Sequence, residues 1–125
     1  MVEPLIIITN NPMVMDKMSN RFETVFVDGM LMDVLKHVRD YVHKGHRLLT
    51  HPLSGSIKPN VTPYKTVLIS YINGKTTDIE SLSVIESSIH TAEKLMQSKE
   101  IPKWPEKVLD DFSLIDYDLI YHAIN

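Results

Sequence analysis

The sequence predicts an α/β fold: a single three-layer domain with a mainly parallel sheet of about four strands, Rossmann-like or flavodoxin-like, plus C-terminal helices. Apolar, β-prone runs alternate with segments of helical periodicity, in the order strand, helix, strand, helix, strand, loop, strand, helix. The chain has 125 residues, which fits one domain over residues 1–125, with the segment 104–125 packed on it as helix. Its 43% apolar and 23% charged residues are ordinary for a globular protein.

The first part of the chain is predicted to contain two strands joined by a helix. Residues 5–9 form a continuous apolar run, which is typical of a strand buried on both faces. Asn11 is a good N-cap and Pro12 suits the first helical position, so we expect a helix from there to about residue 21. Residues 23–27 are expected to form the second strand.

A long amphipathic helix and two further strands are predicted next. Residues 30–44 place apolar side chains at helical spacing, and Gly45 suits the C′ position that ends a helix. The expected buried stripe consists of Leu31, Val34, Leu35, Val38 and Val42. Residues 47–50 are expected to form the third strand and residues 66–72 the fourth.

The last third of the chain is predicted to be helical. Thr77 and Glu80 match a capping box, in which each side chain bonds a free amide at the helix start, and the helix should reach about residue 97. Pro105 is expected to open a last helical segment, with a break near residues 113–116.

The formal net charge of −3 hides a strong segregation along the chain. Residues 1–40 carry −2, residues 41–77 carry +5 and residues 78–125 carry −6. The middle segment has no Asp or Glu, and it includes a connection, 51–65, of a length that is usually functional or disordered. We expect the basic segment either to bind an anion or to face the acidic C-terminal helices, within the domain or across a dimer.

Composition argues against several classes of protein. The absence of cysteine excludes a disulfide scaffold, a zinc ribbon, an iron–sulfur cluster and a thiol nucleophile. The acidic balance argues against nucleic acid or a membrane surface as a general partner. The apolar run at residues 5–8 is too short for a signal sequence or a membrane span, so we expect a cytoplasmic protein.

The 51–65 connection supplies most of the candidate ligand-binding residues. Several of its polar side chains alternate, so an extended segment would direct all of them to one side. These residues are Ser54, Ser56, Lys58 and Asn60. Gly55 allows a close approach to the backbone, and Tyr64 and Lys65 could supply a second wall. The alternative is a solvated loop in which Ser and Pro merely shape turns.

The end of the first strand is a second candidate position. Thr9, Asn10 and Asn11 precede a predicted helix, whose unpaired amides attract phosphate or carboxylate. Plain capping by Asn11 is the alternative. Neither a dinucleotide-binding fingerprint nor a Walker loop is present, so the sequence gives no support for a nucleotide cofactor.

The main candidate for catalysis is His51, because it is the plausible general base in the loop and imidazole titrates near neutrality. Asp28, at the end of the second predicted strand, is a second candidate by position, and a turn aspartate before Gly29 is the alternative. Ser54 and Ser56 lack the nucleophile-elbow motif. Four of the six histidines lie between residues 37 and 51, but they share no helix face and the segment 41–77 has no carboxylate. We therefore expect no metal site.

Two stretches of the chain resemble a known family. The opening LIIITNNP at residues 5–12, the run VLKHVRDYVHKGHRLLTHPLSGSIKPNVTPYKTVLIS within residues 34–71, and the total length together resemble the GrdX family. Its members are small proteins encoded beside the glycine, sarcosine and betaine reductase components of amino-acid-fermenting anaerobes. The resemblance implies a cytoplasmic protein close to the reduction of amino acids to acyl phosphates and ammonia, and it assigns no catalytic residue.

Three functions follow as hypotheses. The first is an accessory protein that binds a small carboxylate or phosphate compound, with Lys58 and Lys65 neutralising its charge. The second is a small enzyme on the same site that acts on an acyl phosphate or amino-acid derivative, with His51 as base. The third is a module that docks a reductase subunit through the basic loop. A second copy of the chain is a further candidate partner, and no cofactor is expected.

Overall fold

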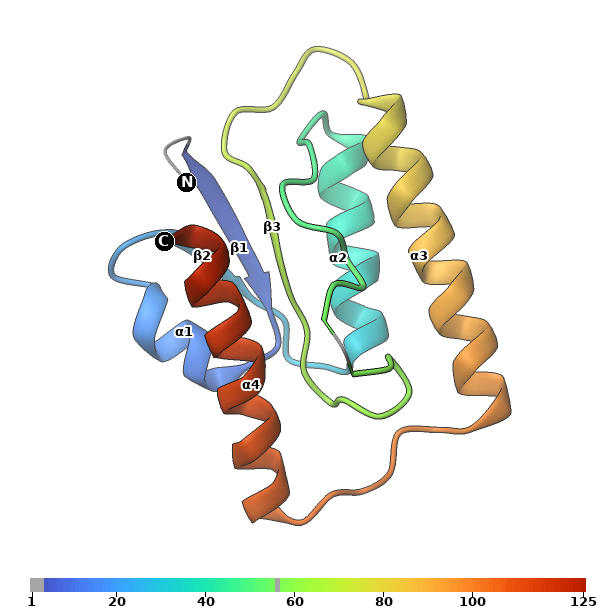
Figure 1. Ribbon diagram of the computed structural model, residues 1–125. Helices are drawn as coiled ribbons and strands as arrows, with labels where there is room; N and C mark the ends of the chain where they lie inside the picture. Colours follow the sequence, from blue (N-terminus) through green and yellow to red (C-terminus); the bar gives the residue numbers. More distant parts are fainter. Residues whose placement is uncertain (1–3, 56) are drawn as a thin grey trace.

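The computed structural model describes residues 4–55 and 57–125 and shows a three-stranded mixed sheet in the order β2-β1-β3 (Figure 1). The central strand β1 (Leu5–Thr9) pairs in parallel with β2 (Glu23–Phe26) and antiparallel with β3 (Thr66–Ser70). All five residues of β1 are buried, which confirms the prediction of a strand covered on both faces.

Helices cover both faces of the sheet. On one face, α2 (Leu31–His43) and α3 (Ile79–Ser98) pack on alternate strand residues, including Ile6 and Ile8 of β1. On the other face, α1 (Pro12–Met18) and α4 (Glu106–Ile124) pack on Leu5 and Ile7 (Figure 1). The period-two alternation of a strand therefore divides β1 between two hydrophobic cores.

The predicted mainly parallel, four-stranded sheet is wrong. The segment 47–50 makes a single antiparallel bridge to β3, between Leu48 and Ile69. At two positions a side-chain hydroxyl, and not a backbone carbonyl, accepts the hydrogen bond from a backbone amide. Leu68 N donates to Thr50 Oγ1 at 3.0 Å, and Arg47 N donates to Ser70 Oγ at 2.8 Å. The segment thus runs along β3 without becoming a regular strand.

The path of residues 47–50 explains why β3 runs antiparallel to β1. Because residues 47–50 and β1 are both antiparallel to β3, residues 47–50 run in the direction of β1. The 51–65 connection then lies at the carboxyl end of β1, and β3 starts there, with Thr66 paired to Thr9. The Rossmann-like and flavodoxin-like arrangements expected from the sequence do not form, since they need a parallel crossover at this point.

The 51–65 connection is built from turns, so its expected extended alternation is wrong. The amides of Val61 and Thr62 both donate to the carbonyl of Lys58, at 2.9 and 3.2 Å. Lys58 is exposed, whereas Asn60, two residues later, is buried. The side chains therefore do not share one side of the segment.

Two of the predicted helix signals are confirmed. Asn11 caps α1, because its side-chain oxygen accepts from Met13 N at 3.0 Å. Gly45 follows the end of α2 with a φ of 105°, the left-handed conformation that favours glycine at C′.

The capping box predicted for α3 is wrong by one residue, since Asp78 is the N-cap and accepts from Ser81 N at 3.1 Å. Thr77 instead donates to the carbonyl of His43 at 3.1 Å.

The expected break in the last helical segment is also wrong, because α4 runs without interruption from Glu106 to Ile124. The polar residues Ser113 and Asp116 that suggested the break are buried on the face of α4 that meets the sheet. They are tolerated there because side chains of β3 and of the β1–α1 turn form hydrogen bonds with them. Within residues 4–55 and 57–125, no helix is both long and apolar enough to cross a bilayer.

Candidate functional site

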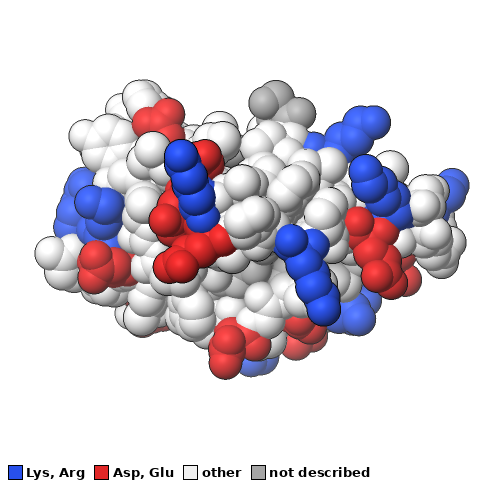
Figure 2. All heavy atoms as spheres, turned by 90° about the horizontal axis from the view of Figure 1, so that it is seen from below, with Lys and Arg blue, Asp and Glu red and all other residues white. Residues whose placement is uncertain are grey.

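A small cavity lies between the 51–65 connection and α4, at the edge of the sheet where β1 ends and β3 begins. Its volume is about 190 Å³. The polar residues around it are Ser54, Thr62, Tyr64, Lys65, Asp116 and Asp118. The molecular face seen from below, where the 51–65 connection lies, carries acidic and basic side chains scattered around an uncharged central area (Figure 2). The cavity therefore does not belong to a broad surface of one charge.

Lys65 places a buried amine at this cavity. The residue is 6% exposed. Its backbone N–H donates to Asn10 Oδ1 at 2.8 Å, and its Nζ donates to the carbonyl of Ser54 at 2.6 Å. Among the described residues Ser54 is the one hydrogen-bond acceptor of Nζ. Since an ammonium carries three hydrogens, two remain for a ligand.

Burial shapes the protonation of Lys65. Loss of hydration lowers the pKa of the Lys65 ammonium, and the opposite charge of Asp116 acts against this shift by raising it. The amine is thus held in a weakly hydrated position beside one carboxylate, where an added negative group would stabilise its charged form.

Asp116 brings a buried carboxylate to the same cavity from α4. It is 7% exposed. Its Oδ2 accepts from Thr66 Oγ1 at 2.6 Å and from Asn11 Nδ2 at 3.0 Å. Both of these side-chain hydrogen bonds go to Oδ2, and the backbone N–H of Thr66 also stabilises the carboxylate. Burial raises the pKa of Asp116, and the hydrogen bonds and the charge of Lys65 partly offset that shift.

The predicted site residues Thr9 and Asn11 belong to the support of the cavity. Thr9 Oγ1 lies 2.7 Å from Thr66 Oγ1 and accepts from Asn11 N at 2.9 Å. Asn11 Nδ2 donates to the carbonyl of Ser113 at 2.9 Å, and Ser113 Oγ donates to Asn11 Oδ1 at 2.6 Å. These buried side chains tie the end of β1 to α4, and their polar atoms bond within the protein.

Asn10 has a similar structural position on the other side of β1. Its side-chain nitrogen donates to the carbonyl of Gly29 at 3.1 Å and to that of Pro63 at 2.9 Å, while its side-chain oxygen accepts from Lys65 N. Asn10 therefore fixes the backbone that enters β3 and so sets the position of Lys65.

Several predicted residues of the connection do meet at the cavity. Ser54, Gly55, Tyr64 and Lys65 all line it. Gly55 has a φ of 114°, which favours glycine at this position. Burial raises the pKa of the Tyr64 hydroxyl, and the charge of Asp110 raises it further. Ser56 lies outside the described residues.

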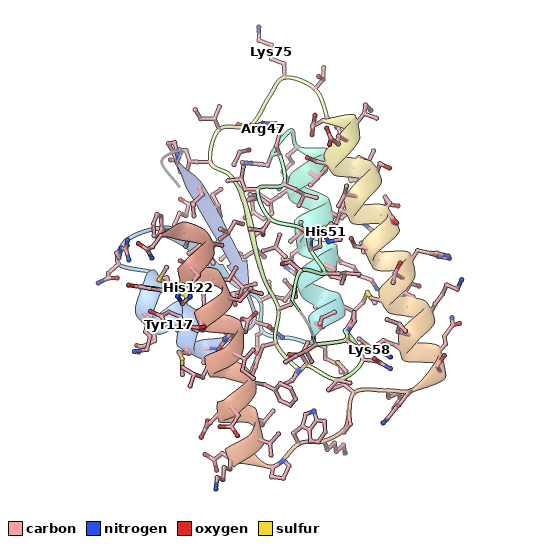
Figure 3. The ribbon with its side chains drawn as sticks, viewed as in Figure 1. Arg47, His51, Lys58, Lys75, Tyr117 and His122 are labelled. Carbon is pink, nitrogen blue, oxygen red and sulfur yellow. The ribbon has the colours of Figure 1, made fainter. Side chains whose placement is uncertain are left out.

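Other predicted residues lie elsewhere. His51 is exposed, its Nδ1 pairs with Leu53 N at 3.1 Å, and it borders a shallow hollow with Val84 of α3. Asn60 is buried toward α3 and donates to the carbonyl of Leu95 at 3.4 Å. Lys58 is exposed near the end of α3 (Figure 3). The cavity of Lys65 thus does not include His51, Lys58 or Asn60.

The carboxylate-free segment does not form one basic surface. Lys75 lies at the top of the view and Lys58 in its lower half, and Arg47 lies near the top with Lys75 (Figure 3). The pKa of Asp78 is lowered by its hydrogen bonds from Ser81 and also by the charge of Arg47.

Within residues 4–55 and 57–125, no three His, Asp or Glu side chains gather as metal ligands.

Sequence reasoning missed Asp116, which supplies the acidic half of the site. The buried residues of α4 are Ser113, Asp116, Ile120 and Ile124, at spacings of three and four. A signal was therefore present, since a carboxylate on the apolar stripe of a helix needs a partner inside the protein. Its partner residues lie near residues 11 and 66, which only the fold brings close.

A comparison with family models matches residues 6–125 to the family described as GrdX-like protein. The chain belongs to the GrdX-like family. The match covers α4, so this GrdX-like assignment extends well beyond the two stretches that suggested it, and it confirms the resemblance. Comparisons with curated proteins and with solved structures find no match. The roles of Lys65 and Asp116 in the GrdX-like chain therefore rest on the geometry of the cavity.

Proposed function

We propose that this GrdX-like protein binds a small anionic ligand, a carboxylate or a phosphate compound, in the cavity at Lys65, and that it acts in the cytoplasm as an accessory protein of amino-acid reductase metabolism. The observation that carries the first part is a buried lysine that lines a cavity and whose amine donates, among the described residues, to the carbonyl of Ser54 alone. The family designation supports the second part, since the family resembled is encoded beside reductase components.

The physics of the site favours an anion at Lys65. Hydrogen bonds to charged groups contribute about 1.5–3 kcal/mol each, roughly twice the contribution of neutral ones. The carbonyl of Ser54 is a neutral acceptor, so a ligand oxygen with negative charge would form a stronger, charge-assisted hydrogen bond with this weakly hydrated amine.

The cavity also limits the size of the ligand. Its volume of about 190 Å³ is below the roughly 300–1,000 Å³ of ordinary small-molecule pockets. A ligand of a few non-hydrogen atoms fits this volume, whereas most of a nucleotide would lie outside the cavity, in solvent. A small acid or a phosphate ester of a short chain is the class that size and charge select together.

Lysine replacement tests the proposal. Nuclear magnetic resonance titrations of the labelled protein with propionate, β-alanine and inorganic phosphate should shift the backbone resonances of Gly55 and Asp116, which line the cavity. Lys65→Met removes the charge and keeps the aliphatic stem, so binding should weaken at least tenfold, which equals about 1.4 kcal/mol.

Lys58→Met is the matched control, because Lys58 belongs to the same connection but is exposed and away from the cavity. Its binding should remain within twofold of the wild-type value. Equal losses in the two variants would show that binding depends on the overall charge of the connection, and the proposal for Lys65 would then be wrong.

A further inference from the structure

We infer that the ligand of the Lys65 cavity is a small zwitterion, with a carboxylate that meets Lys65 and an ammonium that meets Asp116. The inference rests on the proposed function, because it concerns the same cavity and specifies the class of its ligand. The observation behind it is the juxtaposition of a buried cation and a buried anion in the lining of one cavity, one from the 51–65 connection and one from α4.

A simple anion does not suit the whole cavity. Asp116 and the exposed Asp118 both line it, and each would repel a ligand that carries negative charge alone. A simple ammonium ligand would be repelled in the same way by Lys65. A ligand that carries both charges can place its carboxylate beside Lys65 and its ammonium beside Asp116. The carboxylates of Asp116 and Asp118 then attract the ligand.

The two buried charged groups in the cavity lining match the two ends of a zwitterion. Nζ of Lys65 has two hydrogens beyond its bond to Ser54, and these suit a ligand carboxylate. The carboxylate of Asp116 lines the same cavity, and its negative charge suits a ligand ammonium. Each end of the ligand therefore finds a partner of opposite charge in the cavity lining.

The balance of charge points the same way. Lys65 and Asp116 have opposite charges that influence one another, so the buried pair has no net charge. Adding a ligand of zero net charge keeps the buried site neutral, whereas adding an ion introduces a charge without a buried partner, which is costly.

The spacing of the two groups should select the length of the ligand. Asp116 is held by Thr66 and Asn11, and Lys65 is held by Asn10 and Ser54. Since both groups are fixed by buried hydrogen bonds, the distance between them is set before the ligand arrives. Amino acids in which different numbers of carbons separate the charges should therefore bind with clearly different affinities.

The experiment compares ligands that differ in one charged group. The wild-type protein is titrated with glycine, β-alanine and 4-aminobutyrate, with the matched carboxylates acetate, propionate and butyrate, with propylamine, and with inorganic phosphate. The best amino acid should bind at least tenfold more tightly than its matched carboxylate and than propylamine. In Asp116→Asn this preference should fall to threefold or less, and in the control Asp111→Asn, on an exposed position of α4 outside the cavity, it should persist.

The outcomes separate the two proposals. If a carboxylate or phosphate binds as tightly as the amino acid of the same length, the zwitterion inference is overturned and the proposed anion site stands. If no compound shifts the cavity resonances, or propylamine binds best, both proposals fail. Should Asp116→Asn not fold, the comparison of ligands on the wild-type protein still decides, and Asp118→Asn, at the exposed rim, should reduce the preference by a smaller factor.

Discussion

Asn11 joins α1, the sheet and α4, and its replacement by alanine should destabilise the protein by about 3 kcal/mol. The side chain caps α1 through the bond from Met13 N, and loss of such a cap costs about 1 kcal/mol. It also bonds Ser113 and Asp116, both buried. Asp116 keeps its bond from Thr66, but losing the bonds from Asn11 to Ser113 and Asp116 costs about 1 kcal/mol for each of the two, which gives the stated total.

Urea unfolding followed by far-ultraviolet circular dichroism measures the effect. The midpoint should fall while the slope stays constant, because the change acts on the folded state without altering the surface exposed on unfolding. Asn20→Ala is the matched control, since Asn20 is exposed just beyond α1 and should stay within about 0.5 kcal/mol of wild type. A loss under about 1 kcal/mol for Asn11→Ala would refute the assignment of Asn11 as the link between α1 and α4.

A double-mutant cycle isolates the part of this effect that belongs to α4. Ser113→Ala removes the hydroxyl that donates to Asn11 Oδ1 at 2.6 Å and leaves the backbone carbonyl that accepts from Asn11. The coupling energy between Asn11→Ala and Ser113→Ala should be about 1 kcal/mol, as for residues that share a buried hydrogen bond. Additive effects would mean that the two side chains stabilise the protein independently.

Two further predictions concern stability. Burial raises the pKa of Asp116 above its usual 3.8 in the folded protein. The protonated group therefore favours the folded state below pH 3.8, and this contribution is lost as pH rises through the folded-state pKa. Asp116→Asn should accordingly gain stability relative to wild type as pH rises, measured by urea unfolding at a series of pH values. A relative stability independent of pH would contradict this. Gly45→Ala should cost about 2–4 kcal/mol in the same assay, since φ is 105° and the new Cβ would collide with the carbonyl oxygen of Gly74. Gly74→Ala, whose Cβ would meet Thr76 O at 3.5 Å, is the control and should cost under about 1 kcal/mol.

The sequence predicted local structure better than strand pairing. The apolar run of β1, the Asn11 cap and the stripe of α2 depend on neighbouring residues, and all three are confirmed. The pairing of β3 depends instead on contacts between residues far apart in the chain, such as its antiparallel register with β1 and the bonds of Thr50 and Ser70 to the backbone of Leu68 and Arg47. Nothing in the run 47–50 distinguishes a strand from a segment with one bridge, so the parallel sheet was a reasonable but wrong prediction.

The candidate site was half visible in the sequence. The connection between residues 51 and 65 stood out by its length and by its lack of carboxylates, and it does supply Lys65. Asp116 could not be placed beside it, because the two residues meet only after α4 packs on the sheet through contacts between distant segments. The acidic segment 78–125 therefore contributes a specific charged residue, Asp116, to the cavity that Lys65 of the basic segment also lines.

The irregular segment 47–50 has a consequence for association between molecules. A free strand edge offers unpaired amides and carbonyls to a strand of another chain. Along β3 the amide of Leu68 is taken by Thr50 Oγ1, its carbonyl by the amide of Leu49, and the amide of Ser70 by the carbonyl of Arg47. Residues 47–50 thus occupy the hydrogen-bonding groups of Leu68 and Ser70 at the outer edge of β3, although they form no strand of their own. A strand of a second molecule cannot pair with β3 at these positions. The edge that could accept such a strand is that of the four-residue strand β2.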